Sequence, residues 1–122
     1  MILRLPSFLL SPFIGGAWAV TYGHLILVKK ADYIQAEEYW LIPHEQLHQQ
    51  RQLAYGYFKW WWRYNVDKAF RIAEEVLAYR LSVEKGLPLE GAIYYLVNNY
   101  KVSMTNEEAQ YLLTRPDTTQ GA

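Results

Sequence analysis

Residues 41–50 read Leu41-Ile42-Pro43-His44-Glu45-Gln46-Leu47-His48-Gln49-Gln50, and the centre of this stretch matches the pattern H-E-x-x-H. Residues four apart lie on the same face of a helix, so a helix would bring the imidazoles of His44 and His48 toward one metal ion. Glu45 would project beside that ion, where a carboxylate can take a proton from a metal-bound water. A catalytic zinc uses three protein ligands and keeps one position open. The pattern therefore predicts one further ligand elsewhere in the chain.

The candidates for this ligand lie on a second predicted helix, which spans about 66–85. Its inward stripe is expected to consist of Phe70, Ala73, Leu77, Ala78 and Leu81. The helix also carries Glu74 and Glu75, and consecutive residues are about 100° apart around a helix, so only one of these carboxylates can face the metal squarely. Periodicity slightly favours Glu74, because it shares the apolar stripe. The pattern alone leaves the choice between the two glutamates open.

The composition limits both the size of the protein and the chemistry of the site. A chain of 122 residues is expected to form one domain. Twelve basic residues balance twelve acidic ones, which offers no electrostatic case for a nucleic acid or an anionic membrane as partner. The chain has no cysteine, so a zinc ion would have to be held by His, Asp or Glu. One zinc ion is the expected cofactor.

The amino-terminal part combines apolar and turn-forming residues. Residues 1–15 are expected to form an irregular apolar arm, and two short strands are expected at 18–22 and 24–29, on either side of Gly23. No charged residue lies between Leu5 and Val28, a length that could span a bilayer. Prolines and glycines interrupt this stretch, so an arm and strands packed on the core are favoured. The cytoplasm is slightly favoured as the location, with export or membrane association left open.

The remaining elements are predicted to be helical. The H-E-x-x-H helix should begin near Leu41 or Pro43 and end near Tyr55, before a short helix or extended linker at 57–64. Another helix should run from Pro88 to about Tyr100, and Thr105-Asn106-Glu107-Glu108 is a capping box that should start the last helix. The chain thus divides into an arm at 1–15, a metal-site core at 16–86, carboxy-terminal helices at 87–115 and a tail at 116–122.

The combination of His44-Glu45-x-x-His48 with Glu75, Ala78 and Tyr79 resembles the gluzincin metallopeptidases, and in particular their compact members called minigluzincins. Ala19-x-Thr21-x-Gly23-x-x-Ile26-x-Val28 is similar to the strand that precedes their motif helix, and the resemblance covers roughly 16–83. It implies a single zincin-like domain of the α+β class, mainly helical, with a small amino-terminal β-hairpin or sheet packed against the H-E-x-x-H helix. It also implies that Glu75 is the third zinc ligand and that Glu45 is the general base of a peptidase.

Several further assignments follow from the same resemblance. The substrate, a peptide or protein, would lie along an edge strand that contains His24, Ile26 and Val28. Tyr79 stands where many gluzincins have an aspartate that orients a histidine ligand, so Tyr79 and Glu74 are candidates for supporting the ligands or the transition state.

Two alternatives to the peptidase use the same residues differently. The first is a non-catalytic module that zinc stabilises. The second is a membrane-associated protein that contacts lipid through its apolar amino terminus or through Trp60-Trp61-Trp62. This membrane contact is not favoured.

Overall fold

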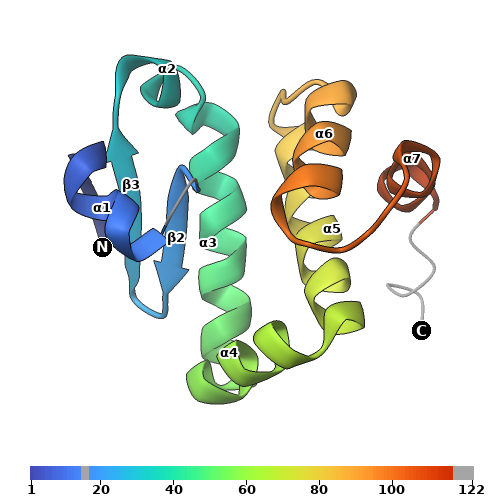
Figure 1. The fold of residues 1–122 in the computed structure, drawn as a ribbon, viewed down its shortest axis with the longest axis horizontal. Helices are drawn as coiled ribbons and strands as arrows, with labels where there is room; N and C mark the ends of the chain where they lie inside the picture. Colours follow the sequence, from blue (N-terminus) through green and yellow to red (C-terminus); the bar gives the residue numbers. More distant parts are fainter. Residues whose placement is uncertain (15–16, 117–122) are drawn as a thin grey trace.

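The computed structural model describes residues 1–14 and 17–116 and has an α+β architecture (Figure 1). In chain order the elements are β1 (Ile2–Pro6), α1 (Ser7–Ile14), β2 (Ala19–Tyr22), β3 (Leu25–Lys30), α2 (Asp32–Gln35), α3 (Glu38–Tyr55), α4 (Tyr57–Val66), α5 (Lys68–Glu84), α6 (Leu89–Asn99) and α7 (Asn106–Thr114). The described residues are mainly helical, with one three-stranded sheet. The predicted α+β class is confirmed.

The sheet has the strand order β1-β3-β2, with β1 parallel and β2 antiparallel to β3. The β2–β3 hairpin turns at Gly23, whose φ of 57° lies in the left-handed region that glycine adopts readily. The prediction of an irregular arm at 1–15 is wrong, because its described residues form β1 and α1. β1 pairs with a strand more than twenty residues away, with Ile2 opposite Ile26. Local turn signals cannot reveal such a long-range pairing.

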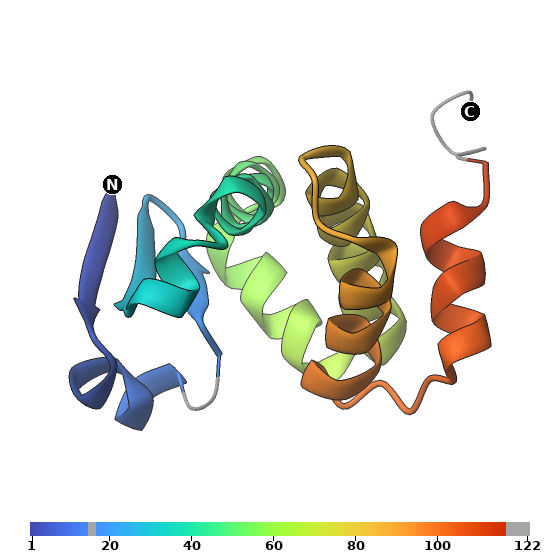
Figure 2. The same cartoon turned by 90° about the horizontal axis from the view of Figure 1, so that it is seen from above.

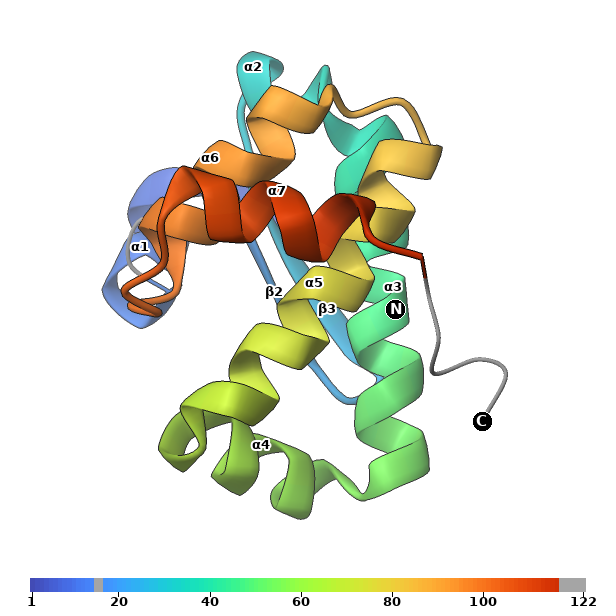
Figure 3. The same cartoon turned by 90° about the vertical axis from the view of Figure 1, so that its right-hand side faces the viewer.

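The elements form successive layers, with α3 at the centre (Figure 2). One side of α3 contacts β2 and β3, and the other side contacts α5. Helix α6 packs on α5, and α7 crosses α5 and α6 on the side away from the sheet (Figure 3). The core that joins these layers includes Ile26, Val28, Ile34, Trp40, Leu41, Val76, Tyr79, Leu87, Ala92, Leu96, Ala109 and Leu113. Helix α3 is therefore shielded on both sides, which allows it to carry buried polar residues.

The helices differ from their predicted bounds mainly at α3 and α4. Helix α3 begins at Glu38, earlier than predicted, so Pro43 lies inside it rather than in its first turn. For residues 57–64 the sequence predicted either a short helix or an extended linker. The structure has a helix there, because residues 57–66 form α4. Helix α5 is capped by Asp67, and the Thr105 capping box at the start of α7 is confirmed. Among the described residues, no helix is both long and apolar enough to cross a membrane.

The inward stripe predicted for α5 is only partly correct. Ala78 is buried, but Ala73 is exposed and Phe70, Leu77 and Leu81 are half-buried. The buried residues of α5 are instead Glu74, Glu75, Val76, Ala78, Tyr79 and Ser82. Because α3, α4, α6 and α7 all contact α5, polar residues on several of its faces become buried. The spacing of apolar residues along the sequence cannot identify helix faces that are buried but carry polar residues.

Candidate metal centre

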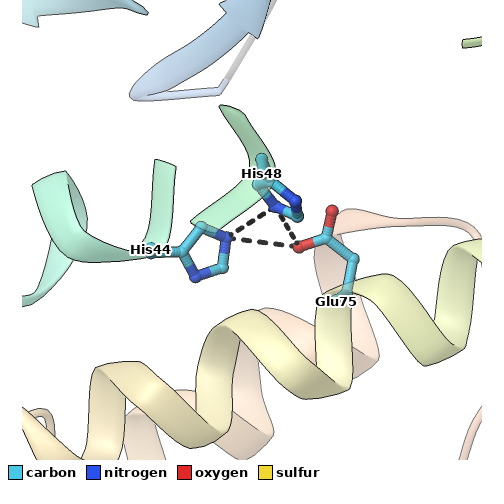
Figure 4. Close-up of side chains that lie close together, drawn as sticks. All are labelled: His44, His48 and Glu75. Carbon is cyan, nitrogen blue, oxygen red and sulfur yellow. Dashed lines mark hydrogen bonds and ion pairs between the residues drawn. The ribbon is translucent and has the colours of Figure 1, made fainter. Parts of the chain in front are cut away.

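Three polar side chains from α3 and α5 meet in the interior (Figure 4). His44 Nε2 lies 3.2 Å from His48 Nε2, His48 Nε2 lies 3.2 Å from Glu75 Oε1, and His44 Nε2 lies 3.3 Å from the same Oε1. All three side chains are buried. Zinc ligands at about 2.0–2.1 Å in a tetrahedral site lie about 3.3–3.4 Å from one another. The nearly equilateral triangle of donor atoms therefore fits a zinc ion of tetrahedral coordination.

Glu74 lies on the neighbouring face of α5 and turns away from the imidazoles. Arg51 Nε lies 2.8 Å from both of its carboxylate oxygens, and Trp60 Nε1 donates to Oε1 at 2.6 Å. Glu74 thereby links α5 to α3 and α4. The preference that periodicity gave to Glu74 is wrong, because both glutamates are buried and only Glu75 approaches the two histidines.

The different surroundings of the two glutamates predict different effects of the same substitution. We expect Glu74→Gln to lower the free energy of unfolding by about 1–3 kcal/mol, because it weakens the charge-assisted hydrogen bonds that the buried Glu74 accepts from the half-exposed Arg51. Bound zinc should stay at the wild-type level in Glu74→Gln and fall sharply in the matched variant Glu75→Gln. Denaturant unfolding and metal analysis of both purified variants measure these effects. Loss of zinc in Glu74→Gln and its retention in Glu75→Gln would instead make Glu74 the ligand and Glu75 the structural residue.

Hydrogen-bond partners outside the triangle orient the donor atoms of His44 and Glu75. The Ser82 hydroxyl donates to the Ala78 carbonyl oxygen at 3.0 Å, so its oxygen is left to accept from His44 Nδ1, which lies 3.2 Å away. A proton on Nδ1 leaves His44 Nε2 unprotonated and able to bind a metal. The Tyr64 hydroxyl donates to Glu75 Oε2, so that Oε1 faces the histidines. Burial and the charge of Glu75 raise the pKa of Tyr64, which keeps this hydroxyl protonated.

The electrostatics of the cluster favour a negative Glu75 beside the imidazoles. Burial would raise the pKa of Glu75, but His48 and His44 hold it well below its usual range. Burial would lower the pKa of His48, but the charge and hydrogen bond of Glu75 outweigh burial and raise this pKa to about 9. Histidine binds a metal only through an unprotonated ring nitrogen. A cation bound by the three donor atoms would therefore displace the proton from His48 Nε2.

Glu45 is buried between α3 and the sheet, next to His44. Its backbone carbonyl oxygen accepts a hydrogen bond from Thr21 Oγ1 at 3.0 Å, and the same hydroxyl lies 3.4 Å from Glu45 Oε2. Burial raises the pKa of Glu45, and the charges of His48 and His44 oppose this shift only in part. A carboxyl with a raised pKa is suited to take up and release a proton.

The strand predicted as the substrate edge is not an edge. β3 is the central strand, with β1 on one side and β2 on the other, so His24, Ile26 and Val28 do not offer a free edge. His24 is exposed at the hairpin turn, and Ile26 and Val28 are buried. The strand with a free side near the metal centre is β2. The prediction of an edge strand at residues 24–28 failed because the sequence does not reveal that β1 pairs with β3.

Part of the free side of β2 is covered by a side chain of α3. Gln52 Nε2 donates to the Thr21 carbonyl oxygen at 2.9 Å, and Gln52 Oε1 accepts from the Gly23 N–H at 2.6 Å. Because N–H and C=O groups of alternate residues point to the same side of a strand, the groups of Ala19 point in the same direction. Ala19, which lines the smaller cavity together with Glu45, therefore has its N–H and C=O on the free side of β2.

Tyr79 contacts a ligand through its ring rather than through its hydroxyl. The rings of Tyr79 and His44 are 4.3 Å apart between centroids, at an interplanar angle of 61°. The Tyr79 hydroxyl lies 2.6 Å from the hydroxyl of Tyr100, at the carboxy-terminal end of α6. Tyr79 therefore packs against His44 and holds Tyr100 in place. Tyr64, Ser82, Gln52 and Tyr100 were not identified from the sequence, because none belongs to the H-E-x-x-H pattern.

Two cavities border the candidate metal centre. The smaller, of about 170 Å³, is lined by all three candidate ligands together with Trp60, Trp61 and Tyr64. The larger, of about 530 Å³, opens on His44 and Glu45 and extends between the sheet and α6. Both cavities are lined by Ala17, Ala19, His44, Glu45 and Tyr100. The two cavities adjoin along these shared residues and are here called the two arms of one cleft, with Glu45 on the wall of both.

Comparisons of this chain with models of protein families, with curated proteins and with solved structures found no match. The assignment of a function therefore depends on the geometry and chemistry of the cleft.

Proposed function

We propose that the protein is a zinc-dependent metallopeptidase of the gluzincin type, with His44, His48 and Glu75 as the zinc ligands. The observation that carries this proposal is the triangle of three buried donor atoms with sides of 3.2–3.3 Å. The cleft that leads to this triangle supports an enzyme, because a purely structural zinc site is normally closed by four protein ligands. The buried carboxyl of Glu45 on the same cleft supports a hydrolytic reaction.

The residues of the cleft have separate roles in the proposed reaction. When bound, a zinc ion supplies Lewis acidity and lowers the pKa of a water to about 7. Glu45 accepts a proton from the attacking water and later donates it to the leaving amine. Tyr64 and Ser82 keep Glu75 and His44 oriented toward the ion. The peptide groups of Ala19 align an extended substrate by adding it to the free side of β2.

The proposal predicts that protein produced with ample zinc contains about one equivalent of the metal and cleaves an unstructured polypeptide. A strong chelator should stop cleavage and added zinc should restore it, because the ligands are donated by two preformed helices. Metal analysis and identification of new amino termini in the products measure both effects. A wild-type protein that holds no zinc under these conditions would contradict the proposal.

The arrangement also favours a second candidate, a zinc-stabilised module without catalysis. Two of the ligands belong to α3 and one to α5, so the ion would crosslink the layers on either side of the cleft. This module would bind one zinc without hydrolysing any peptide, and removal of the metal would unfold it. Circular dichroism after chelation, combined with the cleavage assay, separates the two candidates.

A further inference from the structure

We propose that the larger arm of the cleft is a subsite for an aromatic side chain, so that the protein acts on peptides with Trp, Tyr or Phe next to the cleaved bond. The position of this residue relative to the bond rests on the proposed peptidase function. The binding of an aromatic group in the cavity does not rest on the peptidase function. This binding can be measured separately.

The size of the cavity suits one large side chain and the adjoining backbone. Its volume of about 530 Å³ lies within the range of about 300–1,000 Å³ that is typical of small-molecule sites. Six aromatic residues line it, which are Trp18, Trp40, Tyr79, Tyr94, Tyr95 and Tyr100. Ala17, Ala19 and Leu41 provide the aliphatic part of the wall.

The aromatic wall is already ordered by contacts among its own rings. Tyr95 stacks on Trp40 with centroids 5.5 Å apart and meets the edge of Trp18 at 5.7 Å. Tyr94 meets Tyr95 edge-on at 5.8 Å. Stacked and T-shaped pairs are also the arrangements that a further ring would adopt against these rings. An aromatic guest gains these contacts in addition to burial, whereas an aliphatic guest gains only burial.

The polar groups of the cavity disfavour charged guests. Among the described lining residues the only ionisable groups other than tyrosine hydroxyls are His44 and Glu45, which lie at the metal-centre end. A lysine or glutamate side chain bound between the rings would lose water without gaining an opposite charge along most of the cavity. Asn98 and Asn99 are exposed on the wall formed by α6. Asn98 Nδ2 donates to the Tyr94 carbonyl oxygen at 2.8 Å, so the amide oxygen of Asn98 and the amide of Asn99 are the groups that can bond to a peptide backbone.

The cavity is placed to position a bond for cleavage. It shares Ala19, His44, Glu45 and Tyr100 with the smaller cavity that contains all three ligands. A side chain held against the aromatic wall can therefore place its own backbone toward Glu45, which lines both cavities. Much of the wall comes from α6, which lies outside the part of the chain that resembles gluzincins.

The test compares three probes, N-acetyl-tryptophanamide, N-acetyl-leucinamide and N-acetyl-lysinamide, by chemical-shift titration of the isotope-labelled full chain. We expect the tryptophan amide to bind at least fivefold more tightly than the leucine amide, and the lysine amide to bind most weakly. Tyr94→Ala should weaken binding of the tryptophan amide about three- to tenfold, because a ring pair is lost. Tyr111→Ala is the matched control, since Tyr111 is 63% exposed on α7, Tyr94 is 61% exposed, and only Tyr94 lines the cavity.

A second variant, Trp18→Leu, tests the aromatic wall next to β2 and should also reduce the preference for the tryptophan amide. Equal affinities for the tryptophan and leucine amides, or equal effects of Tyr94→Ala and Tyr111→Ala, would overturn the inference. Selective binding without any peptide cleavage would support the subsite and refute the peptidase. Cleavage without selective binding, at sites that lack aromatic residues, would refute the subsite and leave the peptidase standing.

Discussion

Glu45→Gln lowers the rate of peptide cleavage by about 100- to 10,000-fold while one equivalent of zinc remains bound, if Glu45 is the general base of the reaction. Glutamine has nearly the same shape, and the hydrogen bond from Thr21 Oγ1 to the backbone carbonyl oxygen of residue 45 stays in place. It cannot take a proton from water near neutral pH. Cleavage rates and zinc content of the purified variant, measured on the same sample, test this expectation.

Glu107→Gln is a suitable control for this experiment, because Glu107 is exposed on α7 and does not line either cavity. It removes the same charge without touching the cleft and should leave the cleavage rate unchanged. A Glu45→Gln protein that keeps both its zinc and its full activity would exclude Glu45 as the base. If the variant loses its zinc as well, the role of Glu45 lies in supporting the ligands.

We expect His44→Ala to abolish stable zinc binding, because it removes one corner of the donor triangle and leaves two of the three proposed ligands. The affinity should fall by more than the 10- to 100-fold loss that is typical when only an outer partner of a ligand is removed. Free zinc at about 1,000 times its dissociation constant stabilises the wild-type fold by about 4 kcal/mol, and this gain should vanish in the variant. Metal analysis and thermal unfolding with and without zinc measure the two effects.

The third histidine of the chain provides the matched control. His24 is exposed at the turn between β2 and β3 and is not part of the donor triangle. His24→Ala should therefore keep one equivalent of zinc and the full rise in thermal stability on adding it. Retention of zinc by His44→Ala, or its loss in His24→Ala, would contradict the proposed centre.

The parts of the structure that the sequence predicts well are local. The hairpin at Gly23, the helix that carries His44 and His48, and the capping box at Thr105 each depend on residues within a few positions of one another. The spacing of four residues on one helix is sufficient to place both imidazoles on one side. The resemblance to gluzincins then indicated Glu75 correctly as the glutamate that approaches these histidines.

The parts that could not be predicted depend on contacts between distant segments. The pairing of β1 with β3 made β3 the central strand and moved the free edge to β2. The choice between Glu74 and Glu75 depends on the packing of α4, which brings Trp60 to Glu74 and Tyr64 to Glu75. Hydrogen bonds of this kind are formed between side chains whose positions follow only from the complete fold.

The side-chain amide of Gln52 has a consequence for how the sheet behaves among many copies of the chain. Its oxygen and nitrogen bond to Gly23 N–H and the Thr21 carbonyl oxygen, where the peptide groups of a fourth strand would otherwise bond. A strand with free peptide groups along its whole length can recruit a strand from another molecule and start aggregation. Because Gln52 is almost completely buried at 1% exposure, this part of β2 is closed to such recruitment. Gln52 therefore blocks strand addition at Thr21 and Gly23, whereas it does not cover the peptide groups of Ala19.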